Sequence, residues 1–169
     1  MQRFFDEPRI HDEEFFGFDW QFTLTDSTEF PSAEAQWRDV QLPHDWSVDY
    51  PVEEDAACCG SGGYVRTGIG WYRRAFSVNL MEDSRYAIRF DGVYMNCDVW
   101  LNGQHIGGHV YGYIGFEMEL TALREGRNEL LVRVNNSLQP GSRWYSGSGI
   151  TRSVYLVRTG HTRLRPGGL

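Results

Sequence analysis

The chain has 169 residues, which is the length of one ordinary domain, and 41% of them are hydrophobic, so a buried core is possible and disorder is excluded. The 16 basic residues, all arginine, are outnumbered by 23 acidic ones, and the net charge of −7 argues against nucleic acid as a partner. No apolar run reaches the length of a membrane span, so we expect no membrane partner.

The three cysteines do not indicate a disulfide framework or a zinc site. Cys58 and Cys59 are adjacent, Cys97 stands alone, and their number is odd. No Cys-x-x-Cys spacing of the kind that binds structural zinc occurs. We therefore expect neither a metal site nor a cofactor in this domain.

Period-two alternation of apolar and polar residues recurs along the chain, and aromatic residues, which favour strands, reach 15%. Each alternating run predicts a strand with one buried face. In chain order, the expected buried faces are those of Phe18, Trp20, Phe22 and Leu24; Tyr72, Arg74, Phe76 and Val78; Tyr86, Ile88 and Phe90; Cys97, Val99 and Leu101; Phe116, Met118 and Leu120; Leu130, Val132 and Val134; and Val154 with Leu156.

Helical patterns are scarce, and the best of them, residues 121–124, is one turn that Gly126 ends. Asn102-Gly103 predicts a tight hairpin, because both residues tolerate the positive φ of a type I′ turn. Runs of strands without intervening helices predict an all-β fold. We expect an antiparallel β-sandwich, and a jelly roll rather than an immunoglobulin fold, because the Cys–Trp–Cys pattern of the latter is missing.

Two long segments interrupt the strand pattern, residues 45–70 and residues 137–149. Both are rich in turn-forming residues, and both contain tryptophan. Loops of this length in compact domains usually have a function or are disordered. We expect one domain over residues 1–159, followed by an unstructured tail or truncated linker over residues 160–169.

Several motifs, in a fixed order from Trp20 to Leu156, resemble one known family. They are Leu42-Pro43-His44-Asp45-Trp46-Ser47, Gly68-Ile69-Gly70-Trp71-Tyr72-Arg73-Arg74, Phe90-Asp91-Gly92-Val93, Val99-Trp100-Leu101-Asn102-Gly103, and Ser142-Arg143-Trp144-Tyr145-Ser146-Gly147-Ser148-Gly149-Ile150. Together they resemble the N-terminal sugar-binding domain of glycoside hydrolase family 2. The first and last motifs are most similar to the β-galactosidase branch.

The resemblance implies a jelly roll of the galactose-binding-domain type, placed before an immunoglobulin-like domain and a (β/α)₈ barrel that carries both catalytic glutamates. This chain is too short for such a barrel, which needs roughly 200 residues. We therefore expect a non-catalytic domain that completes the sugar pocket of a retaining glycosidase and is inactive alone. Its expected partners are a β-galactoside-like carbohydrate and the barrel. The alternatives are a free-standing carbohydrate-binding module and a structural interaction sandwich.

The loop with Arg143, Trp144 and Tyr145 is the first candidate for sugar binding, because the resemblance implies that it reaches the sugar pocket. Many family members carry an acid at the position of Arg143, where it can bind sugar hydroxyls or a sodium ion. Arginine cannot ligate a cation, so we expect no metal there. Arg143 can still donate to sugar hydroxyls or to a carboxylate of the barrel. Trp144 either stacks on a sugar or anchors the domain to the barrel.

Asp45 and Trp46 form the second candidate, with two interpretations. In the structural one, Asp45 accepts backbone N–H bonds as a turn residue and Trp46 covers the edge of the core. In the functional one, this corner faces the sugar pocket. His44 is expected to be a packed, hydrogen-bonded residue, and Glu129 to lie on the solvated face of a strand, so neither is assigned to catalysis.

Overall fold

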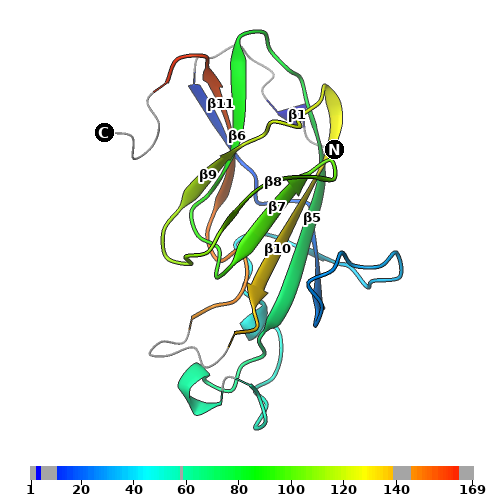
Figure 1. Ribbon diagram of the computed structural model, residues 1–169, viewed down its shortest axis with the longest axis vertical. Coiled ribbons are helices and arrows are strands. Elements are labelled where there is room, and N and C mark those ends of the chain that lie inside the picture. The colour runs from blue at the N-terminus through cyan, green and yellow to red at the C-terminus, as the bar shows by residue number, and fades with distance from the viewer. Residues whose placement is uncertain (1–2, 5–10, 58, 139–145, 164–169) are drawn as a thin grey trace.

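The computed structural model describes residues 3–4, 11–57, 59–138 and 146–163, and it consists of two β-sheets packed face to face (Figure 1). One sheet has seven strands: β4 (Arg38–Val40), β3 (Trp20–Thr25), β5 (Gly68–Val78), β10 (Gly126–Asn136), β7 (Cys97–Leu101) and β8 (Gln104–His109) in this order, with β1 (Arg3–Phe4) beside β5. The other has four: β2 (His11–Phe15), β11 (Val154–Gly160), β6 (Ser84–Phe90) and β9 (Phe116–Glu119).

The pairing of β5 with β10 is the longest in the molecule and is antiparallel from Gly68 opposite Asn136 to Val78 opposite Gly126. On its other edge, β5 pairs with β3 along its first half and with β1 at Ser77 and Val78. The β1–β5 pair is parallel, whereas every other strand pair is antiparallel. The expected antiparallel β-sandwich is therefore confirmed.

The core lies between the two sheets and is filled by the strand faces that the alternation predicts. Leu130, Val132 and Val134 of β10 are all fully buried, and Glu129 is exposed as expected. Phe18 is an exception, because 47% of its surface is exposed. Asp19 adopts a positive φ of 58° that interrupts the extended backbone, so β3 begins only at Trp20 and Phe18 does not share its inward face.

Arg74 occupies the inward face of β5, as the alternation predicts, although it is charged. Its side chain is 2% exposed, and its guanidinium lies 3.6 Å from the centre of the Phe16 ring. Burial lowers the pKa of Arg74 to about 10, and the charge of Asp19 opposes this shift. The arginine therefore remains charged at neutral pH and contributes a cation–π contact to the core.

Two connections at one end of the sandwich are tied together by Asn128. The expected Asn102–Gly103 hairpin is present, with both residues at positive φ. The Asn128 amide oxygen accepts from Asn102 Nδ2 at 2.8 Å and from the Arg124 backbone at 2.9 Å. Its amide nitrogen donates to the carbonyls of Arg124 and Gly126. One buried side chain thus holds the β7–β8 hairpin against the β9–β10 turn.

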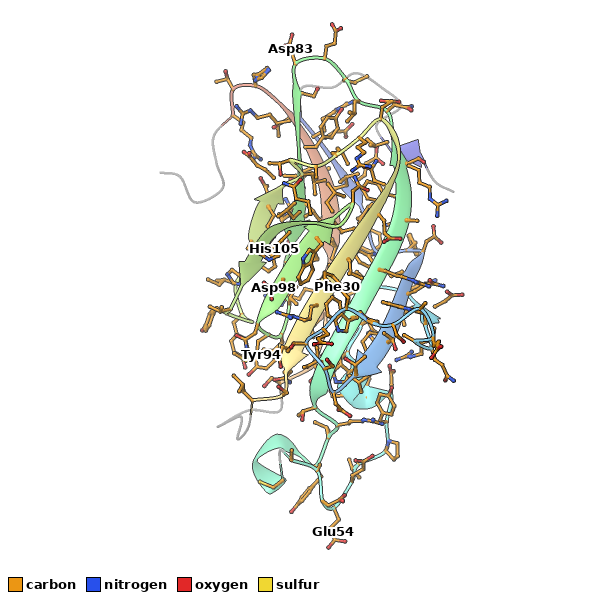
Figure 2. All side chains as sticks on the ribbon, turned by 45° about the vertical axis from the view of Figure 1, so that its right-hand side comes forward. Phe30, Glu54, Asp83, Tyr94, Asp98 and His105 are labelled. Atoms are coloured by element: carbon orange, nitrogen blue, oxygen red, sulfur yellow. The ribbon has the colours of Figure 1, made fainter. Side chains whose placement is uncertain are left out.

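The outer face of the seven-stranded sheet carries an aromatic cluster, over which Phe30 lies in Figure 2. The Phe30 ring centre is 5.4 Å from that of Trp71 and 5.2 Å from that of Trp100. Arg133 spans both indoles and pairs with Asp98 at 2.6 Å. Trp71 is only 1% exposed and therefore offers no open surface, whereas Phe30, which lies over it, is 58% exposed.

No α-helix occurs within the described ranges, where the helical segments are two short 3-10 turns, η1 (Trp46–Val48) and η2 (Gly60–Gly62). Residues 121–124 form a turn and not a helix. The same part of the chain contains no helix long and apolar enough to cross a bilayer. Both 3-10 turns lie in the long segment before β5, at the lower end of the molecule in Figure 1.

Replacing Asn128 with alanine should destabilise the domain by roughly 2–4 kcal/mol, because four part-buried hydrogen bonds to Asn102, Arg124 and Gly126 are lost. Glu129→Ala is the matched control. Glu129 is the exposed neighbour of Asn128, and its replacement should destabilise the domain by less than about 0.5 kcal/mol. Urea denaturation of both variants measures the two costs. Equal effects of the two substitutions would contradict the role given to Asn128.

Candidate functional site

Asp45 connects two segments that lie 103 residues apart in the chain. Its Oδ1 accepts hydrogen bonds from the Ser47 backbone at 2.9 Å, the Ser47 hydroxyl at 2.6 Å and the Ser148 backbone at 2.7 Å. The first of these bonds caps η1. Asp45 therefore has the structural role that the sequence suggested, and it also fixes the segment before β11.

Backbone bonds and a side-chain bond reinforce this junction. Trp46 N donates to Ser148 O at 2.9 Å, and His44 N donates to Ile150 O at 2.8 Å. The Asn136 amide donates to the Ser148 hydroxyl at 2.7 Å, which links the end of β10 to the same segment. We call the junction of residues 44–48 with residues 146–150 the Asp45 corner.

Trp46 packs inside the Asp45 corner. Its side chain is fully buried and stacks on Phe22, with ring centres 5.7 Å apart. A side chain at Gly70 would collide with its indole at 2.5 Å, so glycine is required there for the tryptophan to fit. The structure thus gives Trp46 the core-covering role, and sugar contact by either Asp45 or Trp46 stays a prediction.

His44 links the corner to the core through a chain of hydrogen bonds. The ionised carboxylate of Asp49 can only accept, so His44 donates from Nε2 to Asp49 Oδ2 at 2.9 Å. The other nitrogen of the neutral ring, Nδ1, then accepts from the Tyr72 hydroxyl at 2.7 Å. Arg38 also pairs with Asp49. His44 is thus a hydrogen-bonded structural residue, as expected.

Burial lowers the pKa of His44 and outweighs the opposing effect of Asp49, which favours the protonated imidazole. Burial also raises the pKa of Tyr72 well above its usual value. Both groups are therefore neutral at physiological pH. The direction of each hydrogen bond then runs from Tyr72 to His44 and from His44 to Asp49.

Arg143, Trp144 and Tyr145 lie outside the described residues. The structure does place both flanks of their loop. Asn136 ends β10 on one side, and the chain is described again from Ser146, next to Asp45. The Asp45 corner therefore brings the two flanks of the Arg143 segment close to Asp45 and Trp46. The motifs alone did not establish this proximity.

Three residues outside the predicted site contact the corner or belong to it. Ser148 is hydrogen-bonded within it, Asp49 binds His44 from just outside it, and Tyr94 pairs with Gly149 through two backbone bonds of 2.9 Å. Ser148 lies in one of the family motifs, whereas Asp49 and Tyr94 have no motif that could have indicated them. Among the described residues, no three His, Cys, Asp or Glu side chains gather into a group that could hold a metal ion.

The fold and the Asp45 corner define a jelly-roll β-sandwich domain whose long loops gather at one end. The family model for glycosyl hydrolases family 2, sugar binding domain, matches residues 3–160. The chain belongs to this family, and the resemblance given by the motifs is confirmed.

Known proteins of this family are several times longer than the matched region. The chain is 42% identical to the β-galactosidase BoGH2A of Bacteroides ovatus over 86% of the chain and 18% of that protein. It is 36% identical to a β-glucuronidase of Bacteroides fragilis over 76% of the chain and 19% of that protein. A crystal structure of a family 2 member from Bacteroides cellulosilyticus superposes with a TM-score of 0.79 at 39% identity, covering 88% of the chain and 20% of that protein.

Asp45→Ala should destabilise the domain by about 1–3 kcal/mol, because two backbone N–H groups lose their acceptor. Asp45→Asn keeps an oxygen in this position and should cost less, since asparagine caps about as well as aspartate. Urea unfolding curves compare the two variants. A larger loss of unfolding free energy for asparagine than for alanine would contradict the claim that Asp45 stabilises the corner by accepting hydrogen bonds.

The lowered pKa of His44 predicts that stability rises with pH around the ordinary value of about 6.5. The unfolded chain takes up a proton as the pH falls through that value, whereas the folded chain does so only at lower pH, so stability is lost on acidification. His44→Gln should flatten this dependence between about pH 5 and 7. His161→Gln, which alters a mostly exposed histidine, is the control and should leave the slope unchanged.

Proposed function

We propose that this chain supplies the non-catalytic sugar-binding domain of a retaining family 2 β-glycosidase and forms one wall of its sugar pocket beside a catalytic (β/α)₈ barrel. The observation that supports the proposal is the Asp45 corner, which joins Asn136 and Ser148, on either side of the Arg143 segment, at the loop end of the sandwich. A loop with two large aromatic residues and an arginine, held between fixed flanks, suits a contact with a polar ligand.

The carboxylates near the corner do not support catalysis by this domain. A retaining glycosidase needs two carboxyl groups roughly 5–5.5 Å apart, one of them protonated. Asp45 accepts hydrogen bonds from a cap and a loop, and Asp49 pairs with Arg38 and His44. Asp49 has a lowered pKa, with hydrogen bonds from His44 and Arg38 outweighing burial, and is therefore ionised at neutral pH. These groups hold structure, and the chemical step belongs to the barrel.

The proposed contribution of the loop is positioning. Arg143 donates to hydroxyls of the sugar or to a carboxylate of the barrel. Trp144 offers a broad apolar surface to the sugar or to the barrel wall, and Tyr145 adds a ring with a hydroxyl group. The substrate class is a β-galactoside-like glycoside, a choice supported by the identity of 42% to a protein named as a β-galactosidase.

A domain exchange tests this function. Residues 3–160 replace the corresponding domain of the Bacteroides ovatus β-galactosidase, and hydrolysis of an aryl galactoside is measured. The chimera should be active, and Arg143→Ala or Trp144→Ala should lower its kcat/KM by about tenfold or more, because positioning contacts are lost. The chain alone should not hydrolyse aryl galactosides or glucuronides.

Arg124→Gln is the matched control, since Arg124 is exposed in the β9–β10 turn at the other end of the sandwich (Figure 1). In the chain alone, both loop substitutions should change the unfolding free energy by less than about 1 kcal/mol, as at surface positions. Hydrolysis by the chain alone that one carboxylate substitution abolishes would overturn the proposal. So would loop variants of the chimera with unchanged kcat/KM.

A further inference from the structure

A pocket of about 500 Å³ opens beside the Asp45 corner, and none of its lining residues is among the predicted sugar-binding residues. Three loops form it: the one after β6, the one between β8 and β9, and the segment that leads into β11. We call it the tyrosine pocket, because its walls carry three tyrosines. Its lining residues are Tyr94, Tyr111, Gly112, Tyr113, Ser146, Gly147, Thr151 and Arg152.

The three tyrosines form a continuous aromatic wall. The ring centre of Tyr113 lies 5.4 Å from that of Tyr94 and 5.7 Å from that of Tyr111, both in edge-to-face geometry. Figure 2 places Tyr94 at the lower end of the sandwich, where the loops gather. Tyr111 and Tyr113 are 53% and 45% exposed, so ring surface and hydroxyl groups both remain open to a ligand. Amphipathic rings of this kind suit a ligand with apolar C–H faces and many hydroxyls.

Arg152 lines the same pocket and is an exposed cation. Its backbone pairs with Gly92, and a side chain at Gly92 would come within 2.8 Å of the Arg152 side chain, so glycine leaves room for it. Across the described ranges, the Arg152 guanidinium makes no ion pair and no hydrogen bond with another side chain, whereas Arg38, Arg89 and Arg133 all pair with carboxylates.

The charge of the tyrosine pocket differs from that of the rest of the surface. The pocket over the outer face of the seven-stranded sheet is lined by Asp19, Asp39 and Glu129 in addition to arginines, and the pocket under the β3–β4 loop includes Glu29. None of the described residues that line the tyrosine pocket is a carboxylate, although the chain has a net charge of −7. An anionic ligand therefore meets a local positive charge here.

The neighbouring carboxylates already have partners. Asp91 pairs with Arg89 at 3.3 Å, one residue before the glycine on which Arg152 packs. Asp45 lies behind Gly147, and its Oδ1 is engaged by Ser47 and Ser148. Neither group neutralises the Arg152 guanidinium, which remains able to form a charge-assisted bond to a ligand.

We propose that the tyrosine pocket binds the anionic residue of an acidic saccharide, with Arg152 pairing to its carboxylate or sulfate group and the tyrosine wall contacting the sugar ring. The proposal rests on the proposed function in one respect, that the ligand is a carbohydrate. A planar guanidinium can form two parallel hydrogen bonds with either anionic group, which gives a preference for charged over neutral sugars.

Calorimetric titration of the 169-residue chain with three matched glycosides tests this site. The probes are methyl β-D-glucoside, its 6-sulfate and methyl β-D-glucuronide, which distinguish neutral, sulfated and carboxylated sugars. At least one anionic probe should bind about tenfold more tightly than the neutral one, as expected for a charged hydrogen bond. The stronger of the two anionic probes identifies the group that the pocket prefers.

The substitutions separate the charge from the aromatic wall. Arg152→Gln should abolish the preference for the anionic probe, Arg152→Lys should keep part of it, and Tyr113→Ala should weaken all three probes alike. Arg124→Gln controls for a lost exposed charge and should change nothing. Thermal unfolding midpoints establish that each variant is folded.

Three results would overturn the inference: no binding of any probe at millimolar concentration, equal binding of neutral and anionic probes, or a preference that persists in folded Arg152→Gln. None of them bears on the proposed function, which the chimera tests independently through hydrolysis of a neutral galactoside. A chimera that fails while the chain retains an Arg152-dependent preference would overturn the proposed function alone.

Discussion

One carboxylate oxygen of Asp45 accepts three hydrogen bonds, and these bonds determine how the loop end of this domain is organised. Two segments that are remote in sequence meet there, one from the turn before β5 and one from the approach to β11. Because the second segment leads from β10 of the seven-stranded sheet to β11 of the four-stranded sheet, the same contact also fixes the crossover between the two sheets. The tryptophan that follows Asp45 then closes the core beneath the junction.

The strands could be predicted from sequence because period-two alternation reports directly which face is buried. Leu130, Val132 and Val134 illustrate this. For the strand with Tyr72, Arg74, Phe76 and Val78 the pattern gave only one possible face, and the structure shows that this face is buried with its arginine. Phe18 shows the limit of the method. The positive φ at Asp19 interrupts the extended backbone just before β3. No turn motif surrounds this aspartate, so the sequence does not predict the interruption.

The candidate site could be predicted only in parts. Asp45 was recognisable as a turn residue, but its second partner, Ser148, is set by the tertiary fold and has no local signal. The same holds for His44, whose proton position depends on a tyrosine from β5 and on the aspartate that follows η1. The tyrosine pocket could not be predicted, because three loops supply its walls and none of them contains a motif with known chemistry.

The Asn136–Ser148 bond has a consequence for how this domain can change over evolution. It joins the end of β10 to the segment that leads into β11, so that any loop accommodated between these two residues has fixed ends. The entropic cost of such a loop grows only slowly, by about 0.6 kcal/mol for each doubling of its length. Insertions and deletions between Asn136 and Ser148 should therefore change the stability of the sandwich very little. The length of this loop can vary between homologous domains while the sheets remain unaltered.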